Sequence, residues 1–148
     1  MSIFRTRGFD SIIGKGMGIN GELFMEPNTT LVIEGKAACT KIEVTKKTDK
    51  LDKRTTLRVS GQLCPDQGGQ GLGLVIDIHN VVITGTVVCT ELRVGGTLAV
   101  KAGAMLKAEK IFYRELIVET GAIMLGEMIH LDGQAEMKLE SSLTTPAE

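Results

Sequence analysis

The chain contains three cysteines, which are the side chains of this sequence that bind soft metal ions most strongly. They are Cys39, Cys64 and Cys89, and no two of them form a C-x-x-C pair. A tetrahedral zinc site usually needs such compact pairs and a fourth ligand. His79 is the only histidine near them in the sequence. Because unpaired cysteines are more often small buried hydrophobes, we predict no metal site. An odd number of cysteines also favours a reducing cytoplasm over a disulfide framework.

A glycine-rich segment near the start has the G-x-G-x-x-G spacing of phosphate-binding loops, formed by Gly16, Gly18 and Gly21. That chemistry requires a strand before the loop and a helix N-terminus after it, where backbone amides meet the phosphate. Residues 22–30 contain Pro27 and have no helical period. We therefore interpret these glycines as turn residues and predict no nucleotide and no other cofactor.

A repeat in the sequence indicates which secondary structure carries these cysteines and glycines. Three glycines lie 18 residues apart, and each is followed six residues later by a glutamate. The glycines are Gly85, Gly103 and Gly121, and the glutamates are Glu91, Glu109 and Glu127. A fixed period near 20 residues is typical of one structural unit stacked many times. We expect the three glutamates to form one column at a solvent-facing corner.

Short strand-like segments recur between the glycines, at residues 31–33, 57–59, 81–83, 98–100 and 116–118. They are aliphatic or alternate apolar with polar residues, as short buried strands do. The period extends back through Gly35 and Gly61 if residues 45–55 and 65–73 are inserted loops. The sequence thus predicts an all-β, single-domain β-solenoid over residues 11–133 with about six coils. Flexible segments are expected at 1–10 and 134–148.

Composition is consistent with this architecture and excludes several classes of function. The net charge is −1, with 17 basic and 18 acidic residues, so no overall charge favours nucleic acid. Aromatic residues make up 3% of the chain, and a narrow stack of short strands needs few of them. No apolar run approaches the roughly 18 residues of a membrane span, and the start lacks the apolar stretch of a secretory signal. We expect a cytoplasmic protein.

The two ends of such a stack expose unpaired backbone groups above an apolar core, which favours edge pairing. No amphipathic capping helix is indicated at either end. We therefore predict that ends stack on ends through the apolar residues of the first and last coils. The first coil offers Ile12, Ile13, Met17, Ile19, Leu23 and Phe24, and the last offers Ile123, Met124, Leu125, Met128, Ile129 and Leu131.

The sequence resembles the bactofilins, a family of bacterial polymer-forming cytoskeletal proteins, over residues 11–130. The resemblance depends on three loose motifs in a fairly specific order. These are Ser11-Ile12-Ile13-Gly14-Lys15-Gly16-Met17 with Ile19-Asn20-Gly21-Glu22-Leu23, then Leu31-x-Ile33-x-Gly35, and then Tyr113-Arg114-Glu115-Leu116-x-Val118-x-x-Gly121-Ala122. It implies a right-handed β-helix that polymerises without nucleotide through its end coils. It also implies a scaffold for cell-wall-modifying enzymes and cell shape.

Two features depart from the family pattern: the loops at 45–55 and 65–73 are longer, and proline-rich tails are nearly absent. Members of the family often reach the membrane through a short N-terminal segment. Here that segment has the apolar residues Ile3, Phe4 and Phe9 interleaved with Arg5 and Arg7. A polymer would repeat this weak membrane contact many times. The alternative is a leader without a role.

Two other functions remain as alternatives. Left-handed β-helix acyltransferases also have 18-residue coils, with an aliphatic residue at every sixth position. Lys110 and His130 interrupt that register here, and only His79 and His130 could supply a catalytic base. We therefore predict that the protein is not an enzyme. A monomeric β-helical adaptor, binding partners through one face, would require capped ends.

Overall fold

The computed structural model describes residues 11–44, 54–66 and 73–131. Thirteen β-strands and no helix form this part of the chain. All strand pairs are parallel, and the strands form two sheets. The prediction of an all-β protein is therefore confirmed, and the parallel pairing is compatible with a solenoid. The expected terminal segments and most of the two expected loops lie outside the described residues.

The first sheet has six strands in the spatial order β1-β3-β5-β8-β10-β12. Their bounds are β1 Ser11–Ile13, β3 Thr30–Ile33, β5 Thr56–Val59, β8 Asn80–Ile83, β10 Thr97–Val100 and β12 Glu115–Val118. We call it the six-stranded sheet.

The second sheet has seven strands, with β6 and β7 sharing the place between β4 and β9. Its strands are β2 Gly18–Met25, β4 Lys36–Val44, β6 Gln62–Pro65, β7 Val75–Ile78, β9 Thr86–Val94, β11 Met105–Tyr113 and β13 Ile123–His130. We call it the seven-stranded sheet. The second expected insertion, residues 65–73, begins at Pro65, the last residue of β6, and ends before the first residue of β7, Val75.

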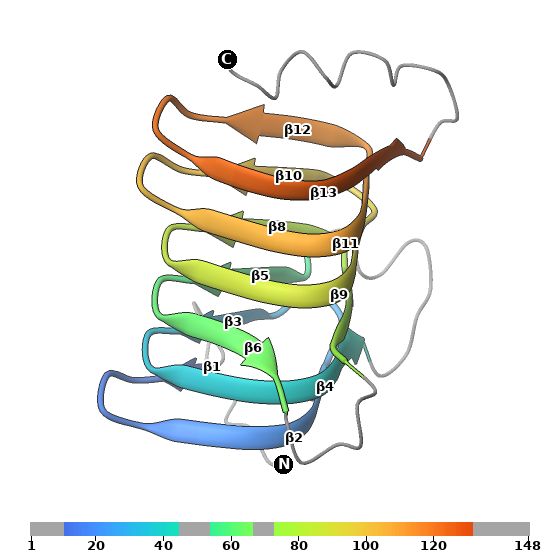
Figure 1. Cartoon of the computed structure of the whole chain (residues 1–148). Coiled ribbons are helices and arrows are strands. Elements are labelled where there is room, and N and C mark those ends of the chain that lie inside the picture. The colour runs from blue at the N-terminus through green and yellow to red at the C-terminus, as the bar shows by residue number, and fades with distance from the viewer. Residues whose placement is uncertain (1–10, 45–53, 67–72, 132–148) are drawn as a thin grey trace.

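Apart from β6 and β7, which follow each other in the seven-stranded sheet, the chain alternates between the two sheets, so that each layer combines strands of both (Figure 1). The first layer, residues 11–29, contains β1 and β2, and the last layer, residues 115–131, contains β12 and β13. These layers lie at opposite ends of the stack (Figure 1). Each strand pairs with strands of the neighbouring layers, and β1, β2, β12 and β13 are the edge strands.

Identical inward positions of successive layers lie on top of one another and form the core. Ile33, Val59, Ile83 and Val100 are such a column, and none of them is more than 1% exposed. The strand β4 shows the alternation, because Ala37, Cys39, Ile42 and Val44 are all buried. Stacks of medium-sized aliphatic side chains fill this narrow interior, which explains why few aromatic residues are needed. Among the described phenylalanine and tyrosine residues, Tyr113 is the only one that is buried.

The glycines of the short turns between the sheets explain part of the repeat. A Cβ added at Gly61 would collide with the carbonyl oxygen of Gly35, and one at Gly85 with that of Gly61. The Gly61 amide also donates to the Ile33 carbonyl at 2.9 Å. Successive turns therefore stack backbone on backbone, and this leaves no room for a side chain.

The prediction that the three glutamates form one column is wrong for Glu109, its middle member. Glu91 pairs with Lys110, and Lys110 pairs with Glu127, so a lysine separates the two carboxylates. Glu109 lies at an irregularity of the β11–β13 register instead. Opposite charges alternate at this position of the sheet, which avoids the repulsion that stacked carboxylates would suffer.

Candidate assembly surfaces

Within the described residues, large exposed hydrophobic side chains are confined to the two end layers. The part of the chain that the structure describes has seven of them, and none belongs to a middle layer. They are Ile12 (47% exposed), Met17 (58%) and Phe24 (43%) in the first layer, and Ile117 (51%), Val118 (45%), Ile123 (51%) and Leu125 (51%) in the last. Scattered exposed hydrophobic side chains are common on protein surfaces and need no explanation. Their restriction to both ends of a stack is not scattered, and it indicates surfaces that bind another molecule.

The cause of this exposure at the last layer is the absence of a further layer in a single chain. Val118 continues the inward column of Val100, which is fully buried, yet 45% of Val118 is exposed. Met124 and Met128 similarly follow Leu106 and Ile111, which are fully buried, but are themselves only half-buried. A covering layer would bury these side chains and would pair the free edges of β12 and β13.

The predicted end residues all lie on the first and last layers, but they differ in how much surface they offer. In the first layer Ile12, Met17 and Phe24 are exposed and Ile19 is half-buried, whereas Ile13 (9% exposed) and Leu23 (7%) are buried. In the last layer Ile123 and Leu125 are exposed, and Met124, Met128, Ile129 and Leu131 are half-buried. Sequence reasoning missed Ile117 and Val118. The signal was present, because their strand segment directly precedes the last strand within one period.

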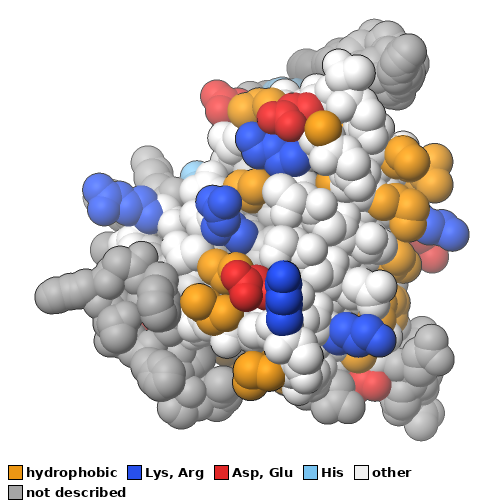
Figure 2. Space-filling view, turned by 90° about the vertical axis from the view of Figure 1, so that its left-hand side faces the viewer, with side chains coloured by type: hydrophobic (Ala, Val, Ile, Leu, Met, Phe, Trp, Pro, Cys, Tyr) orange, Lys and Arg blue, Asp and Glu red, His pale blue; other side chains and the backbone are white. Residues whose placement is uncertain are grey.

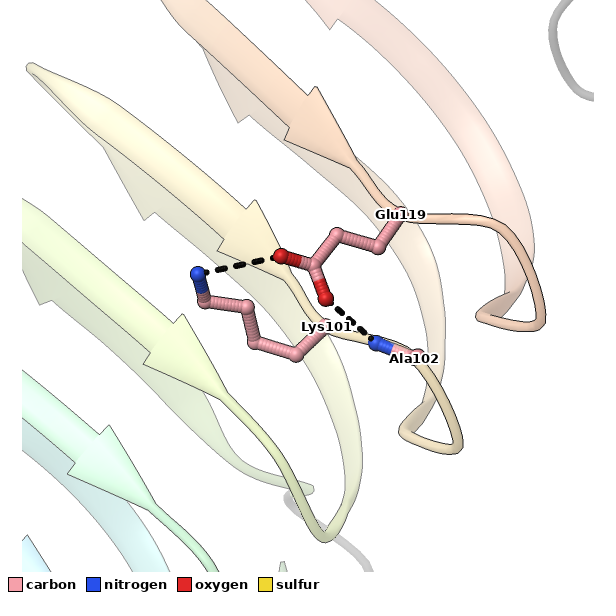
Figure 3. Close-up of polar contacts among 3 residues, drawn as sticks. All are labelled: Lys101, Ala102 and Glu119. Atoms are coloured by element: carbon pink, nitrogen blue, oxygen red, sulfur yellow. Dashed lines mark hydrogen bonds and ion pairs between the residues drawn. The ribbon is translucent and has the colours of Figure 1, made fainter.

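A carboxylate fastens the last layer to the layer before it (Figure 3). Glu119 accepts a hydrogen bond from the Ala102 backbone amide at 2.9 Å, and its other oxygen lies 3.2 Å from the Lys101 amine. The hydrogen bond from the Ala102 amide, and then the lysine, lower the pKa of the Glu119 carboxyl. Thr97 makes a second link by donating its hydroxyl hydrogen to Glu115 at 3.0 Å. The last layer is therefore held in place although one side of it is uncovered.

The residues first considered for chemistry do not come together in a site. Cys39 and Cys89 are buried and Cys64 is exposed. Burial raises the pKa of the Cys39 thiol to about 11, with smaller contributions from Cys64 and Asp66, and it raises that of Cys89 to about 12. Both thiols therefore stay protonated at neutral pH. No group of three metal-ligating side chains is found among the described residues.

The glycine-rich segment and the two histidines are also separate. Gly16 lies in the turn before β2, whereas Gly18 and Gly21 lie within β2, and no helix follows in the described chain. His79 lies between β7 and β8, and His130 lies at the end of β13 against Tyr113, with 5.2 Å between ring centroids.

No helix of the described residues is long and apolar enough to span a membrane. The residues predicted to contact a membrane, Ile3 to Phe9, lie outside the described part. Comparison of the chain with protein-family models, with curated proteins and with solved structures finds no match.

Proposed function

We propose that this chain is a structural protein that self-assembles end to end into filaments without a nucleotide. In this proposal the stacked layers form a right-handed β-helix of about six coils, and the end layers of neighbouring copies continue the stack. The single observation that supports the proposal most strongly is that exposed large hydrophobic side chains occur only in the first and last described layers.

The energetics of such an end contact favour assembly. Covering a half-exposed aliphatic side chain contributes about 1 kcal/mol, since complete burial contributes about 1.5–3 kcal/mol. Seven such side chains at two ends are enough to offset much of the cost of association. Pairing of the free edge strands would add direction and register, because backbone hydrogen bonds are formed only at the right spacing.

The cellular role that we propose is a cytoplasmic scaffold for cell-wall-modifying enzymes and cell shape, as the resemblance to bactofilins implies. The leader residues Ile3, Phe4, Arg5, Arg7 and Phe9 are proposed to contribute to membrane contact. Neither role requires catalysis, a cofactor or nucleic acid.

The test is to replace Val118, an uncovered inward residue of the last layer, by glutamate. The matched control is Val82→Glu, which places the same charge on the outer face of a middle layer. After circular dichroism has shown that both variants are folded, pelleting at high speed should recover the unmodified protein and the Val82 variant. The Val118→Glu variant should remain in the supernatant. Unchanged pelleting of that variant would mean that the last layer is not an assembly contact.

A further inference from the structure

A histidine, His130, lies at an inward position of the uncovered last layer. The strand register places it directly beside Tyr113 of the layer before, and Val94 precedes Tyr113 in the same column. Val94 is fully buried and Tyr113 is 8% exposed, whereas His130 is half-buried. The imidazole ring therefore continues a core column, on the side of the stack that a further layer would cover.

The other side chains at inward strand positions of the two end layers carry no ionisable group. Each of them pairs with a buried residue of the neighbouring layer, which identifies it as inward. They are Ser11, Ile13, Ile19, Leu23 and Met25 in the first layer, and Leu116, Val118, Met124 and Met128 in the last. A layer from another copy would therefore cover the His130 ring without an inward carboxylate, whichever end supplies it.

The groups of the layer beneath do not replace the water that a new layer would remove from His130. Tyr113 packs edge to face with it, with 5.2 Å between ring centroids, and this contact exists with or without a further layer. The next two residues along the chain are charged. Arg114 donates from Nε to a backbone carbonyl one layer down at 3.0 Å, and Glu115 accepts from the Thr97 hydroxyl at 3.0 Å. Both charged side chains are thus held toward the layer beneath.

We propose that His130 makes end-to-end assembly sensitive to pH, because a further layer can cover the neutral ring much more readily than the charged ring. Burial in apolar surroundings disfavours the charged form of histidine. The assembled state therefore binds fewer protons than the separate chains, so assembly is favoured as the pH rises and is lost as it falls. A histidine side chain ordinarily ionises at about pH 6.5. The inference rests on the proposed filament and adds a condition for its formation.

The carboxylates of the last layer respond in a different pH range. Glu115, Glu119 and Glu127 are exposed. Figure 2, in which the last layer is at the top, shows acidic and hydrophobic side chains together at that end. Glutamate ordinarily ionises at about pH 4.3, and the pKa of Glu119 is lowered by its hydrogen bond from the Ala102 amide and by Lys101. Between about pH 5.5 and 7.5 these groups stay charged, and histidine is the side chain that titrates.

The experiment measures the protein concentration needed for filaments, by high-speed pelleting of the full chain at about pH 7.5 and 5.5 and constant ionic strength. One pH unit below the ordinary midpoint leaves about one histidine in ten neutral. For the unmodified protein, the required concentration should therefore rise about tenfold at the lower pH for each His130 that a contact covers. His130→Gln and His130→Met stay neutral, so their required concentration should not change with pH.

Two further variants are the controls. His79→Gln removes the only other histidine of the chain, which lies between β7 and β8 in the middle of the stack. Asp132→Asn removes the next carboxylate along the chain, which lies outside the described residues. Both variants should keep the pH response of the unmodified protein. Circular dichroism at both pH values verifies that every variant is folded.

Four results would overturn the inference. These are filaments of the unmodified protein that ignore the pH, a pH response that persists in both neutral variants, neutral variants that no longer assemble at about pH 7.5, and a response that is lost in His79→Gln or Asp132→Asn. A failure of the filament proposal looks different, because the unmodified protein would then form no polymer at either pH and any concentration. The pH inference would fall with it.

Discussion

Gly61 shows at the scale of one residue why the repeat exists. Its neighbours above and below are the backbones of other turns, so an added methyl group would overlap with backbone atoms. We expect Gly61→Ala to destabilise the fold by about 1–3 kcal/mol, the usual cost of overpacking. Gly18→Ala is the control, since the nearest atom to its added Cβ would be at an ordinary 3.8 Å. Urea unfolding measures both, and equal midpoints would contradict the proposed role of close turn stacking.

The glycine period was visible in the sequence, but its register was not, because the repeating glycines have different functions. Gly85 is required by close stacking, whereas Gly103 has a φ of +85° and open space around it. Thr86 pairs with Met105, so Ala104 and not Gly103 takes the place of Gly85. The turn between β10 and β11, residues 101–104, is two residues longer than the turn between β8 and β9, residues 84–85. This difference has no signature in composition, and it moved Glu109 out of the predicted column.

The three cysteines predict a simple pattern of reactivity. Burial raises the pKa of Cys39 to about 11 and of Cys89 to about 12, so neither is a thiolate near pH 8. A thiol reagent should modify only Cys64 in the folded protein, and Cys64→Ser should remove that reaction. Because the unfolded thiols ionise near their ordinary pKa, these two groups favour the folded state below pH 9 and lose that contribution as the pH rises toward 11. Rapid modification of two or three thiols in folded protein would contradict the buried assignment.

At the scale of elements, β12 and β13 are edge strands, as β1 and β2 are at the other end of the stack. Each has a neighbour on one side only, and Glu119 provides a side-chain link to the layer beneath. We expect Glu119→Gln to speed amide hydrogen exchange in β12 and β13, since the lysine contact loses its charge. Glu34→Gln is the control, because Glu34 follows β3 at the equivalent position and makes no described side-chain contact. Exchange measured by mass spectrometry should change in the first variant only.

The pH dependence of this link has a definite sign. The pKa of Glu119 is lowered in the folded protein, so its contribution is present above the ordinary carboxyl pKa and is lost as the pH falls through the lowered value. The protection of β12 and β13, taken as the exchange rate relative to the intrinsic rate at each pH, should therefore fall in acid, and unchanged protection of these strands at low pH would contradict the assignment.

Element positions were predicted well because alternating aliphatic residues specify a strand wherever one face is buried. The five short segments proposed from the sequence coincide with β3, β5, β8, β10 and β12. The seven-stranded sheet was not predicted as a separate element, since its strands contain small residues, charges and the insertion between β6 and β7. The exposure of Ile117 and Val118 was not predicted, because the sequence alone did not show that β12 lies in the last layer together with β13.

For the whole molecule, the proposed end contact is apolar and should respond little to salt. Filaments should therefore persist at about 1 M salt, where charges more than about 3 Å apart are screened. Pelleting at low and high salt measures this. Filaments that dissolve in salt would show that charge, and not apolar contact, holds the ends together.

The central claim is that the uncovered end layers make this chain a filament-forming protein. Negative-stain electron microscopy of the purified protein, at two concentrations and without nucleotide, tests it most directly. We expect filaments of uniform narrow width that become more abundant at the higher concentration. A monodisperse particle at both concentrations would contradict the claim, and it would indicate that the exposed residues of the end layers are covered within a single chain.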